Sequence, residues 1–331
     1  MPTNQKLLFL FSLPRSGSTL LQRILAAHNE ITTTSEPWIL LPYLYTLKKD
    51  GVYANYNHIE LFKAVKDFCL ELPHGQDDYV QEINGFVKRL YAKVNKKNAR
   101  YFLDKTPRYH LIAEEIIRTF PGEKFIFLWR NPFAIIASMM DTWGKGKWNI
   151  PVYDVDLYTG LNNLIEAYKN NKDAVFSIRY EDILRNPDDE LKKLFNYLDV
   201  PFYPELLHHF NKIQLKGRLG DPKGIKQYHS ISRVPLEKWK HTMGNPVRKM
   251  WCRRYLKTIG HKNILAIGYH PDMLLSELKS SPFSLRFIIS DMLLIALDRI
   301  HNVISVTERF IIKLKYKFFL GNNPWEKDTV S

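Results

Sequence analysis

A loop near the start of the chain combines the residue types that bind phosphate or sulfate. Residues 14–19 supply a guanidinium, three hydroxyls and a glycine, at Arg15, Ser16, Ser18, Thr19 and Gly17. The apolar run 7–11 precedes the loop, and an amphipathic stretch begins at Leu20. A strand, a loop and a helix N-terminus in this order predict an anion site, because the first helical N–H groups lack intrahelical partners and the dipole end is positive.

The loop differs from the Walker A loop of nucleoside triphosphate-binding proteins, G-x-x-x-x-G-K-[ST]. Aligning Gly17 on the second glycine puts Ser12 at the first glycine and Ser18 at the lysine. Both deciding residues are missing, which disfavours ATP or GTP hydrolysis and a nucleotide kinase. The loop instead resembles the 5′-phosphosulfate loop of sulfotransferases that use 3′-phosphoadenosine 5′-phosphosulfate (PAPS). The resemblance assigns the phosphosulfate to Arg15, Ser16, Gly17, Ser18 and Thr19.

A second segment resembles the other half of that site. Residues 125–129 form an apolar, strand-like run, and Arg130 stands at its end. Pro132 suits the first turn of the helix predicted next, which carries Ser138. The family places its 3′-phosphate site at such a strand, arginine and helical serine, which assigns it to Arg130 and Ser138. Taken alone, this segment favours a surface arginine at a strand end, and the assignment to the phosphate depends on the two half-sites occurring together in the right order.

Two further segments extend the resemblance toward the adenosine. The run 179–184 looks like the R-Y-E-D-L block of the family, which brings Tyr180 near the adenosine; the alternative is an aromatic core residue. The segment 217–240 is rich in Gly, Pro, Lys and Ser and reads as a loop before a helix. In relatives such a loop closes over the cofactor, so Arg218, Lys223 and Ser230 are assigned to cofactor binding. A solvated basic loop is the alternative.

A carboxylate follows the loop glycine by nineteen residues (36 − 17), at Glu36. The short run 31–34 before it predicts a strand, so Glu36 is expected at the carboxyl end of the sheet, where doubly wound folds keep their sites. In several sulfotransferase branches a glutamate here is the general base, and the resemblance assigns this role to Glu36. The structural alternative is a first-turn acid in a helix capped by Ser35 and started by Pro37.

The segment 104–109, Asp-Lys-Thr-Pro-Arg-Tyr, follows an aromatic strand-like run and looks like the D/E-K-T-P block of the family. The resemblance assigns Lys105 to the bridging oxygen or the sulfuryl group, where a point cation neutralises charge on the leaving phosphate. Arg15 is expected to stabilise the same group. Other branches use a histidine as base, which makes His110 the alternative to Glu36.

The elements that must position these residues alternate between strand-like and helix-like segments. This alternation predicts an α/β fold with a doubly wound, mostly parallel sheet flanked by helices, the P-loop-like fold of the sulfotransferases. Residues 1–275 are expected to form the sulfotransferase domain, with a helical insert on the acceptor side at about 44–100. Residues 276–331 are expected to form a C-terminal helical extension.

The net charge and the apolar pattern of the chain favour some classes of ligand and partner over others. Its 331 residues carry 48 basic and 34 acidic side chains, a net charge of +14. This charge suits an anionic cofactor, an acidic acceptor or an anionic membrane. Dispersed basic residues and the absence of a nucleic-acid-binding motif disfavour nucleic acid. The apolar residues of 282–320 predict helices that dock on the domain or a second copy, or a peripheral membrane contact.

Cysteine usage and targeting signals point to the cytoplasm. The two cysteines, Cys69 and Cys252, lie far apart in helix-like surroundings and are expected to be buried thiols. Neither belongs to a ligand cluster, so the sequence implies no metal. The first residues show no signal-peptide pattern, and no uncharged apolar run reaches the roughly 20 residues of a spanning helix. We therefore expect a cytoplasmic protein, with a peripheral position at the membrane as the alternative.

The sequence thus predicts a PAPS-dependent sulfotransferase that modifies an acceptor hydroxyl. The acceptor stays open among a glycan, a lipid, a small alcohol and a tyrosine. Two other classes remain as alternatives: a non-catalytic scaffold that binds the nucleotide, and a nucleotide kinase.

Overall fold

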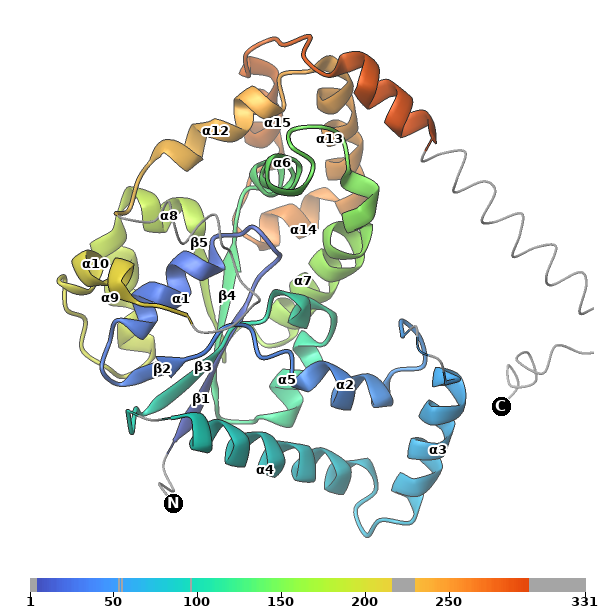
Figure 1. Ribbon diagram of the computed structural model, residues 1–331, viewed down its shortest axis with the longest axis vertical. Helices are drawn as coiled ribbons and strands as arrows, with labels where there is room; N and C mark the ends of the chain where they lie inside the picture. The colour runs from blue at the N-terminus through green and yellow to red at the C-terminus, as the bar shows by residue number, and fades with distance from the viewer. Residues whose placement is uncertain (1–4, 53, 55, 96, 216–229, 298–331) are drawn as a thin grey trace, which may run out of the picture.

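The centre of the molecule is a five-stranded parallel sheet with the order β2-β3-β1-β4-β5 (Figure 1). The computed structural model describes residues 5–297 except 53, 55, 96 and 216–229. The strands are β1 (Lys6–Phe11), β2 (Ile31–Thr33), β3 (Tyr101–Asp104), β4 (Lys124–Trp129) and β5 (Phe176–Arg179). β1 is the central strand: β3 and then β2 lie on one side of it, and β4 and then β5 lie on the other.

The strands are buried on both faces, which explains their continuous apolar runs. Alternate residues of β1 enter different cores: Leu8 and Leu10 pack on one face, and Phe9 and Phe11 on the other. β4 follows the same alternation and pairs with β1 from Leu8 to Phe11. The predicted α/β fold with a mostly parallel sheet is confirmed.

Helices cover both faces of the sheet (Figure 1). One core lies beneath α1 (Ser18–Ala26), α8 (Tyr180–Arg185) and α9 (Pro187–Tyr197). The other lies beneath α5 (Ala113–Thr119), α6 (Pro132–Trp143) and α7 (Leu161–Asn170), backed by α13 (Pro246–Ile259), α14 (His261–Ala266) and α15 (Pro271–Ser280). Short helical turns complete the connections: η1 (Tyr45–Leu47), η2 (Pro107–Leu111), η3 (Ile150–Tyr153), the π-helical η4 (Val155–Gly160), α10 (Leu206–His209) and η5 (Phe210–Lys212).

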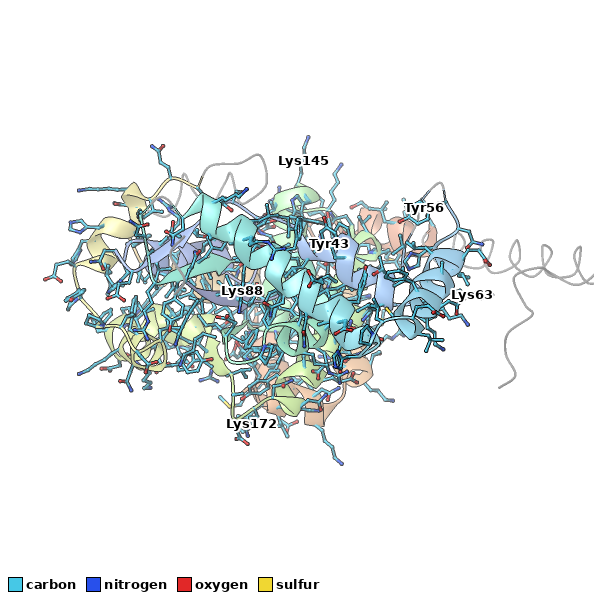
Figure 2. All side chains as sticks on the ribbon, turned by 90° about the horizontal axis from the view of Figure 1, so that it is seen from below. Tyr43, Tyr56, Lys63, Lys88, Lys145 and Lys172 are labelled. Carbon is cyan, nitrogen blue, oxygen red and sulfur yellow. The ribbon has the colours of Figure 1, made fainter. Side chains whose placement is uncertain are left out.

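Three helices separate β2 from β3: α2 (Leu40–Leu44), α3 (His58–Leu70) and α4 (Gln76–Val94). α3 and α4 lie in the range 44–100 where the sequence predicts a helical insert, whereas α2 ends where that range begins. Figure 2 views them from below, with Lys88 on α4, Lys63 on α3 and Tyr43 on α2. The buried residues Ile83, Val87 and Tyr91 attach α4 to the core. Tyr91 of α4 also stacks on Phe102 of β3. β3 ends at Asp104, directly before Lys105 and Thr106.

The described chain from residue 230 to 297 is mainly helical, and its first helix packs against α6. α12 (Val234–Thr242) contacts α6, and the predicted boundary at 275–276 falls inside α15. The guanidinium of Arg248 on α13 forms a fully buried ion pair with Asp291, with Nε 2.6 Å from Oδ2. The helical residues 288–297 leave Ile289, Leu293 and Leu297 exposed. The division into two domains stays a prediction, and residues 298–320 of the predicted contact segment lie outside the described residues.

Both cysteines are free and buried, as predicted. Among the residues that the structure describes, no helix has the length and apolar character needed to cross a membrane.

Candidate active site

The loop between β1 and α1 turns on two residues with left-handed backbone. Gly17 has φ of 90° and Arg15 has φ of 67°. A Cβ atom on Gly17 would lie 2.3 Å from two ring carbons of Tyr180, so only a glycine lets the ring pack this closely against the loop. α1 begins at Ser18 with no acidic residue in its first turn. The loop therefore presents a positive helix end that favours an anion.

Of the five loop residues assigned to the phosphosulfate, four line one cavity and Ser16 does not. Arg15, Gly17, Ser18 and Thr19 border the cavity. Ser16 is fully buried, and its N–H donates to the carbonyl of Leu13 at 3.3 Å. Its hydroxyl borders a small apolar void in the core and has no hydrogen-bond partner within the described residues. Ser16 therefore supports the turn and does not face the cavity.

The second predicted half-site meets the loop directly. Arg130 follows β4, and its Nη1 donates to the carbonyl oxygen of Arg15 at 2.7 Å. Its guanidinium carbon lies 4.6 Å from the ring centroid of Tyr180, within the range of a cation–π contact. On α6, Ser138 Oγ accepts from Nε of Arg15 at 3.2 Å. Arg130, Ser138 and Tyr180 all line the same cavity as the loop.

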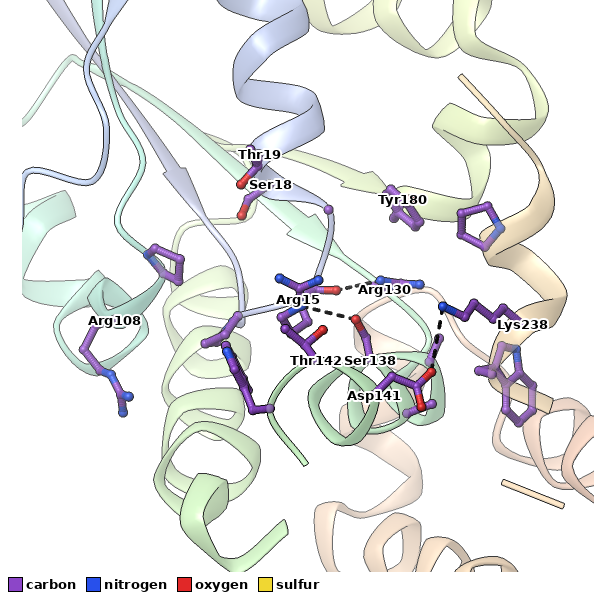
Figure 3. A pocket seen from close by; sticks show the side chains of 18 of the residues that line it. Arg15, Ser18, Thr19, Arg108, Arg130, Ser138, Asp141, Thr142, Tyr180 and Lys238 are labelled. Carbon is purple, nitrogen blue, oxygen red and sulfur yellow. Dashed lines mark hydrogen bonds and ion pairs between the residues drawn. The ribbon is translucent and has the colours of Figure 1, made fainter. Parts of the chain in front are cut away.

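The cavity has a volume of about 410 Å³, and Figure 3 shows side chains that line it. Figure 3 shows Arg15 and Arg130 in its middle, with Arg108 and Lys238 at opposite ends. Its walls come from the loop, α6, α8, α12 and the segments after β2, β3 and β4. The lining residues not yet placed are Pro14, Glu36, Trp38, Pro107, Ala134, Ala137, Asp141, Thr142, Trp143, Pro235 and Trp239.

Glu36 lines the cavity, on the segment that leaves β2. Its Oε1 accepts from Nζ of Lys105 at 2.7 Å, and its Oε2 accepts from Nε1 of Trp38 at 3.3 Å. β2 and β3 are neighbours in the sheet, which is why Glu36 and Lys105, 69 residues apart, meet at the same edge. Both carboxylate oxygens are thus held in fixed directions, one by a cation and one by an indole N–H.

Lys105 lies behind Glu36 and not on the cavity wall. Its side chain is 1 % exposed, whereas that of Glu36 is 12 % exposed. A buried ammonium requires a partner, and Glu36 provides it. The structure therefore brings Lys105 to the carboxylate, whereas the resemblance assigns it to the transferring group.

His110 lies in the core. Its side chain is fully buried, and its Nε2 lies 2.5 Å from Oδ1 of Asp156, which also pairs with Nη1 of Arg108 at 3.1 Å. Burial lowers the pKa of His110. His110 does not line the cavity, whereas Glu36 does.

The loop predicted to close over the cofactor is described only in part. Arg218 and Lys223 lie outside the described residues, and Ser230 is exposed and does not line the cavity. The next helix, α12, contributes Pro235, Lys238 and Trp239 to the wall, and no motif in the sequence predicts this. Nζ of Lys238 lies 4.0 Å from Oδ2 of Asp141 on α6, across the cavity end. No local pattern in the sequence signals this contribution, because it depends on the packing of α12 against α6.

A buried carboxyl supports this part of the site from behind. Asp104 ends β3 and accepts from the Tyr91 hydroxyl at 2.5 Å and the Thr106 hydroxyl at 3.1 Å. Burial raises the pKa of Asp104 to about 6, although its hydrogen bonds act in the opposite direction. The folded protein thus favours the protonated carboxyl more than the unfolded chain does.

This shift predicts a pH dependence of stability. The contribution of protonated Asp104 is fully present below its unfolded pKa and is lost as the pH rises through about 6. Asp104→Asn cannot ionise, so the stability of the wild type relative to this variant should fall by about 2 kcal/mol from pH 4.5 to pH 7.5. Urea unfolding of both proteins across this range measures the difference. If the stability of the wild type relative to Asp104→Asn stayed constant or increased with pH, the raised pKa of Asp104 would be contradicted.

Comparison with known proteins identifies the class. The profile of the sulfotransferase family matches residues 8–205, more than half of the chain, and the chain belongs to this family. It is 28 % identical to nodulation protein NoeE of Sinorhizobium fredii over 209 residues, which make up 56 % of this chain and 48 % of NoeE. It is 24 % identical to a putative protein-tyrosine sulfotransferase of Caenorhabditis briggsae over 241 residues, 71 % of this chain and 81 % of that protein.

The chain also matches a solved structure, the sulfotransferase domain from the curacin biosynthetic pathway. It shares 24 % identity over 71 % of this chain and 90 % of that domain, with a TM-score of 0.46. The chain spans about half the length of NoeE.

Proposed function

We propose that the chain transfers a sulfuryl group from PAPS to the hydroxyl of an acceptor. One observation carries the proposal: a single cavity is lined by the anion-binding loop, by Arg130 with Ser138, and by the carboxylate of Glu36. The reaction needs anion sites for the donor and a base for the acceptor, side by side. Membership of the sulfotransferase family supports the same reaction.

The residues present fit this donor. Nε of Arg130 is buried and has no hydrogen-bond partner within the described residues, so it is available to a phosphate oxygen. The close approach of Tyr180 to Gly17 gives an aromatic surface directly beside the loop. The volume of about 410 Å³ lies within the range of roughly 300–1,000 Å³ for ligand sites.

The donor supplies the sulfuryl group, and its 5′-phosphate is the leaving group. Arg15 and the N-terminus of α1 stabilise the negative charge that develops there. Arg130 and Ser138 hold the 3′-phosphate, and Tyr180 contacts the adenosine. Holding both phosphates fixes the direction of attack, which matters because in-line positioning is a large part of such catalysis.

Glu36 takes the proton of the acceptor hydroxyl. Its Oε1 is engaged by Lys105 at 2.7 Å, whereas Oε2 has the longer contact of 3.3 Å with Trp38, so we assign the proton to Oε2. Lys105 holds the carboxylate in place and adds positive charge next to the transferring group. This combines the role that the resemblance assigns to Lys105 with the contact it makes here.

The acceptor is a hydroxyl on a ring, either a sugar or a phenol. Trp38 and Trp143 line the cavity near Glu36 and Arg15, and they are 36 % and 47 % exposed. Exposed indoles beside a base suit stacking on a flat ring. The names of several relatives, including the Caenorhabditis briggsae protein, give tyrosine as their acceptor, which supports a phenol among the candidates.

The experiment is transfer from ³⁵S-labelled PAPS to a panel of a tyrosine peptide, a chitooligosaccharide, a simple phenol and an aliphatic alcohol. Label on a ring-bearing acceptor, lost in Glu36→Gln, is the expected result. Binding of adenosine 3′,5′-bisphosphate without transfer would favour the nucleotide-binding scaffold. Phosphate transfer from ATP would favour the kinase and overturn the proposal.

Arg130→Lys tests the 3′-phosphate assignment. Lysine keeps the charge but loses the planar fork that contacts both Arg15 and Tyr180. The dissociation constant of adenosine 3′,5′-bisphosphate should rise by roughly 10-fold or more, as expected for a lost charged hydrogen bond of about 1.5–3 kcal/mol. Adenosine 5′-phosphate, which lacks the 3′-phosphate, should bind both proteins alike. Equal loss for both nucleotides would move Arg130 away from the 3′-phosphate.

The remaining partners and the location stay predictions. These are a contact of residues 282–320 with a membrane or a second copy, the absence of nucleic acid among the ligands, and a cytoplasmic position.

A further inference from the structure

Thr106 connects the buried end of β3 to the segment that carries Glu36. It is fully buried and does not line the cavity. Its hydroxyl donates to Oδ1 of Asp104 at 3.1 Å and accepts from the backbone N–H of Trp38 at 3.3 Å. One hydroxyl therefore fixes the segment after β2 to the segment after β3.

Trp38 needs this support. Its backbone has φ of 60°, a left-handed conformation that costs energy for a residue with a large side chain. Strained backbone persists only where surrounding contacts hold it, and such residues gather at functional sites. The hydrogen bond to Thr106 is one contact that holds Trp38, and the indole of Trp38 in turn donates from Nε1 to Oε2 of Glu36 at 3.3 Å.

We propose that Thr106 is a positioning residue for Glu36 and acts through Trp38. The inference rests on the proposed function, in which Oε2 of Glu36 receives the acceptor proton. Lys105 fixes Oε1, and the Thr106–Trp38 link fixes the direction of Oε2. With both oxygens held, Oε2 faces the acceptor before it binds.

The Thr106 hydroxyl makes two hydrogen bonds that an apolar side chain of the same shape cannot make. Valine matches threonine in shape but neither accepts from Trp38 nor donates to Asp104. Serine keeps both hydrogen bonds and loses one methyl group. Thr106→Val and Thr106→Ser are therefore a matched pair that separates the hydrogen bond from the packing.

Kinetics with PAPS and an acceptor test the proposal. Thr106→Val should lower kcat roughly 10- to 100-fold, because small misplacement of a reacting group is costly. The affinity for adenosine 3′,5′-bisphosphate should stay within about twofold of the wild type, since Thr106 does not line the cavity. Thr106→Ser should restore most of kcat. Equal loss in both variants, or a matching loss of nucleotide affinity, would mean a structural role only.

A double variant tests whether the loss of kcat in Thr106→Val arises through Glu36. In the Glu36→Gln background, the addition of Thr106→Val should cause little further loss, because residues that act as a unit are not additive. A full additional loss would overturn the proposed route through Glu36.

A measurement without turnover separates this inference from the proposed function. The indole N–H signal of Trp38 is identified in an ¹⁵N spectrum as the one that Trp38→Phe removes. Thr106→Val and Glu36→Gln should each shift that signal, and Thr106→Ser should leave it near its wild-type position. An unmoved signal in Thr106→Val would overturn the inference. If the signal moves but no acceptor is sulfated, the proposed function fails and the link between the three residues stands.

Discussion

Replacing Glu36 with glutamine should abolish most turnover while leaving the donor site intact. Glutamine keeps the size of the side chain and a carbonyl oxygen, but it cannot take a proton from the acceptor. General-base catalysis contributes about 10²- to 10⁴-fold, so kcat should fall by that factor. Glu36 contacts Lys105 and Trp38, whereas Arg130 and Tyr180 come from the segments after β4 and β5, so the affinity for adenosine 3′,5′-bisphosphate should change by less than about threefold.

The control is Glu237→Gln on α12. This glutamate is 69 % exposed and pairs with Lys240 on its own helix, so the change should leave kcat near the wild-type value. Turnover retained in Glu36→Gln would contradict the assignment. The other carboxylate on the cavity wall is Asp141, which would then be tested next.

Gly17→Ala should remove the donor site. The new Cβ would lie 2.3 Å from the ring of Tyr180, and an alanine at φ of 90° is strained as well. The loop or the ring must move, and both line the cavity. The dissociation constant of adenosine 3′,5′-bisphosphate should rise at least 100-fold, or about 2.7 kcal/mol, measured by calorimetry.

Gly122→Ala separates the ring contact from backbone strain. Gly122 has φ of 79°, but nothing lies within 4 Å of a Cβ placed there. This variant should lose stability by a similar strain and bind the nucleotide as the wild type does. Wild-type binding by Gly17→Ala would contradict the close loop–ring packing.

The sheet and the anion loop follow from local sequence. Parallel strands covered on both faces need continuous apolar runs, so 7–11 and 125–129 identify β1 and β4 directly. The order of strand, glycine loop and helix brings Arg15 and Gly17 to the carboxyl end of β1. Arg130 follows from the same rule at β4. Because strand ends meet at one sheet edge, these two half-sites could be predicted to lie together.

The rest of the site depends on packing between distant segments. α12 enters the cavity wall because it packs on α6, about a hundred residues earlier, and no local pattern states that contact. The pairing of β2 with β3 sets Lys105 on Glu36, which the spacing alone does not reveal. The left-handed backbone of Trp38 and the inward turn of Ser16 also arise from tertiary contacts.

Isothermal titration with adenosine 3′,5′-bisphosphate, with ATP–Mg²⁺ as the control, tests the central claim most directly. We expect one tight site for the bisphosphate and binding at least tenfold weaker, about 1.4 kcal/mol, for ATP–Mg²⁺. No binding of the bisphosphate, or a preference for ATP–Mg²⁺, would contradict a site that pairs the loop at Gly17 with Arg130.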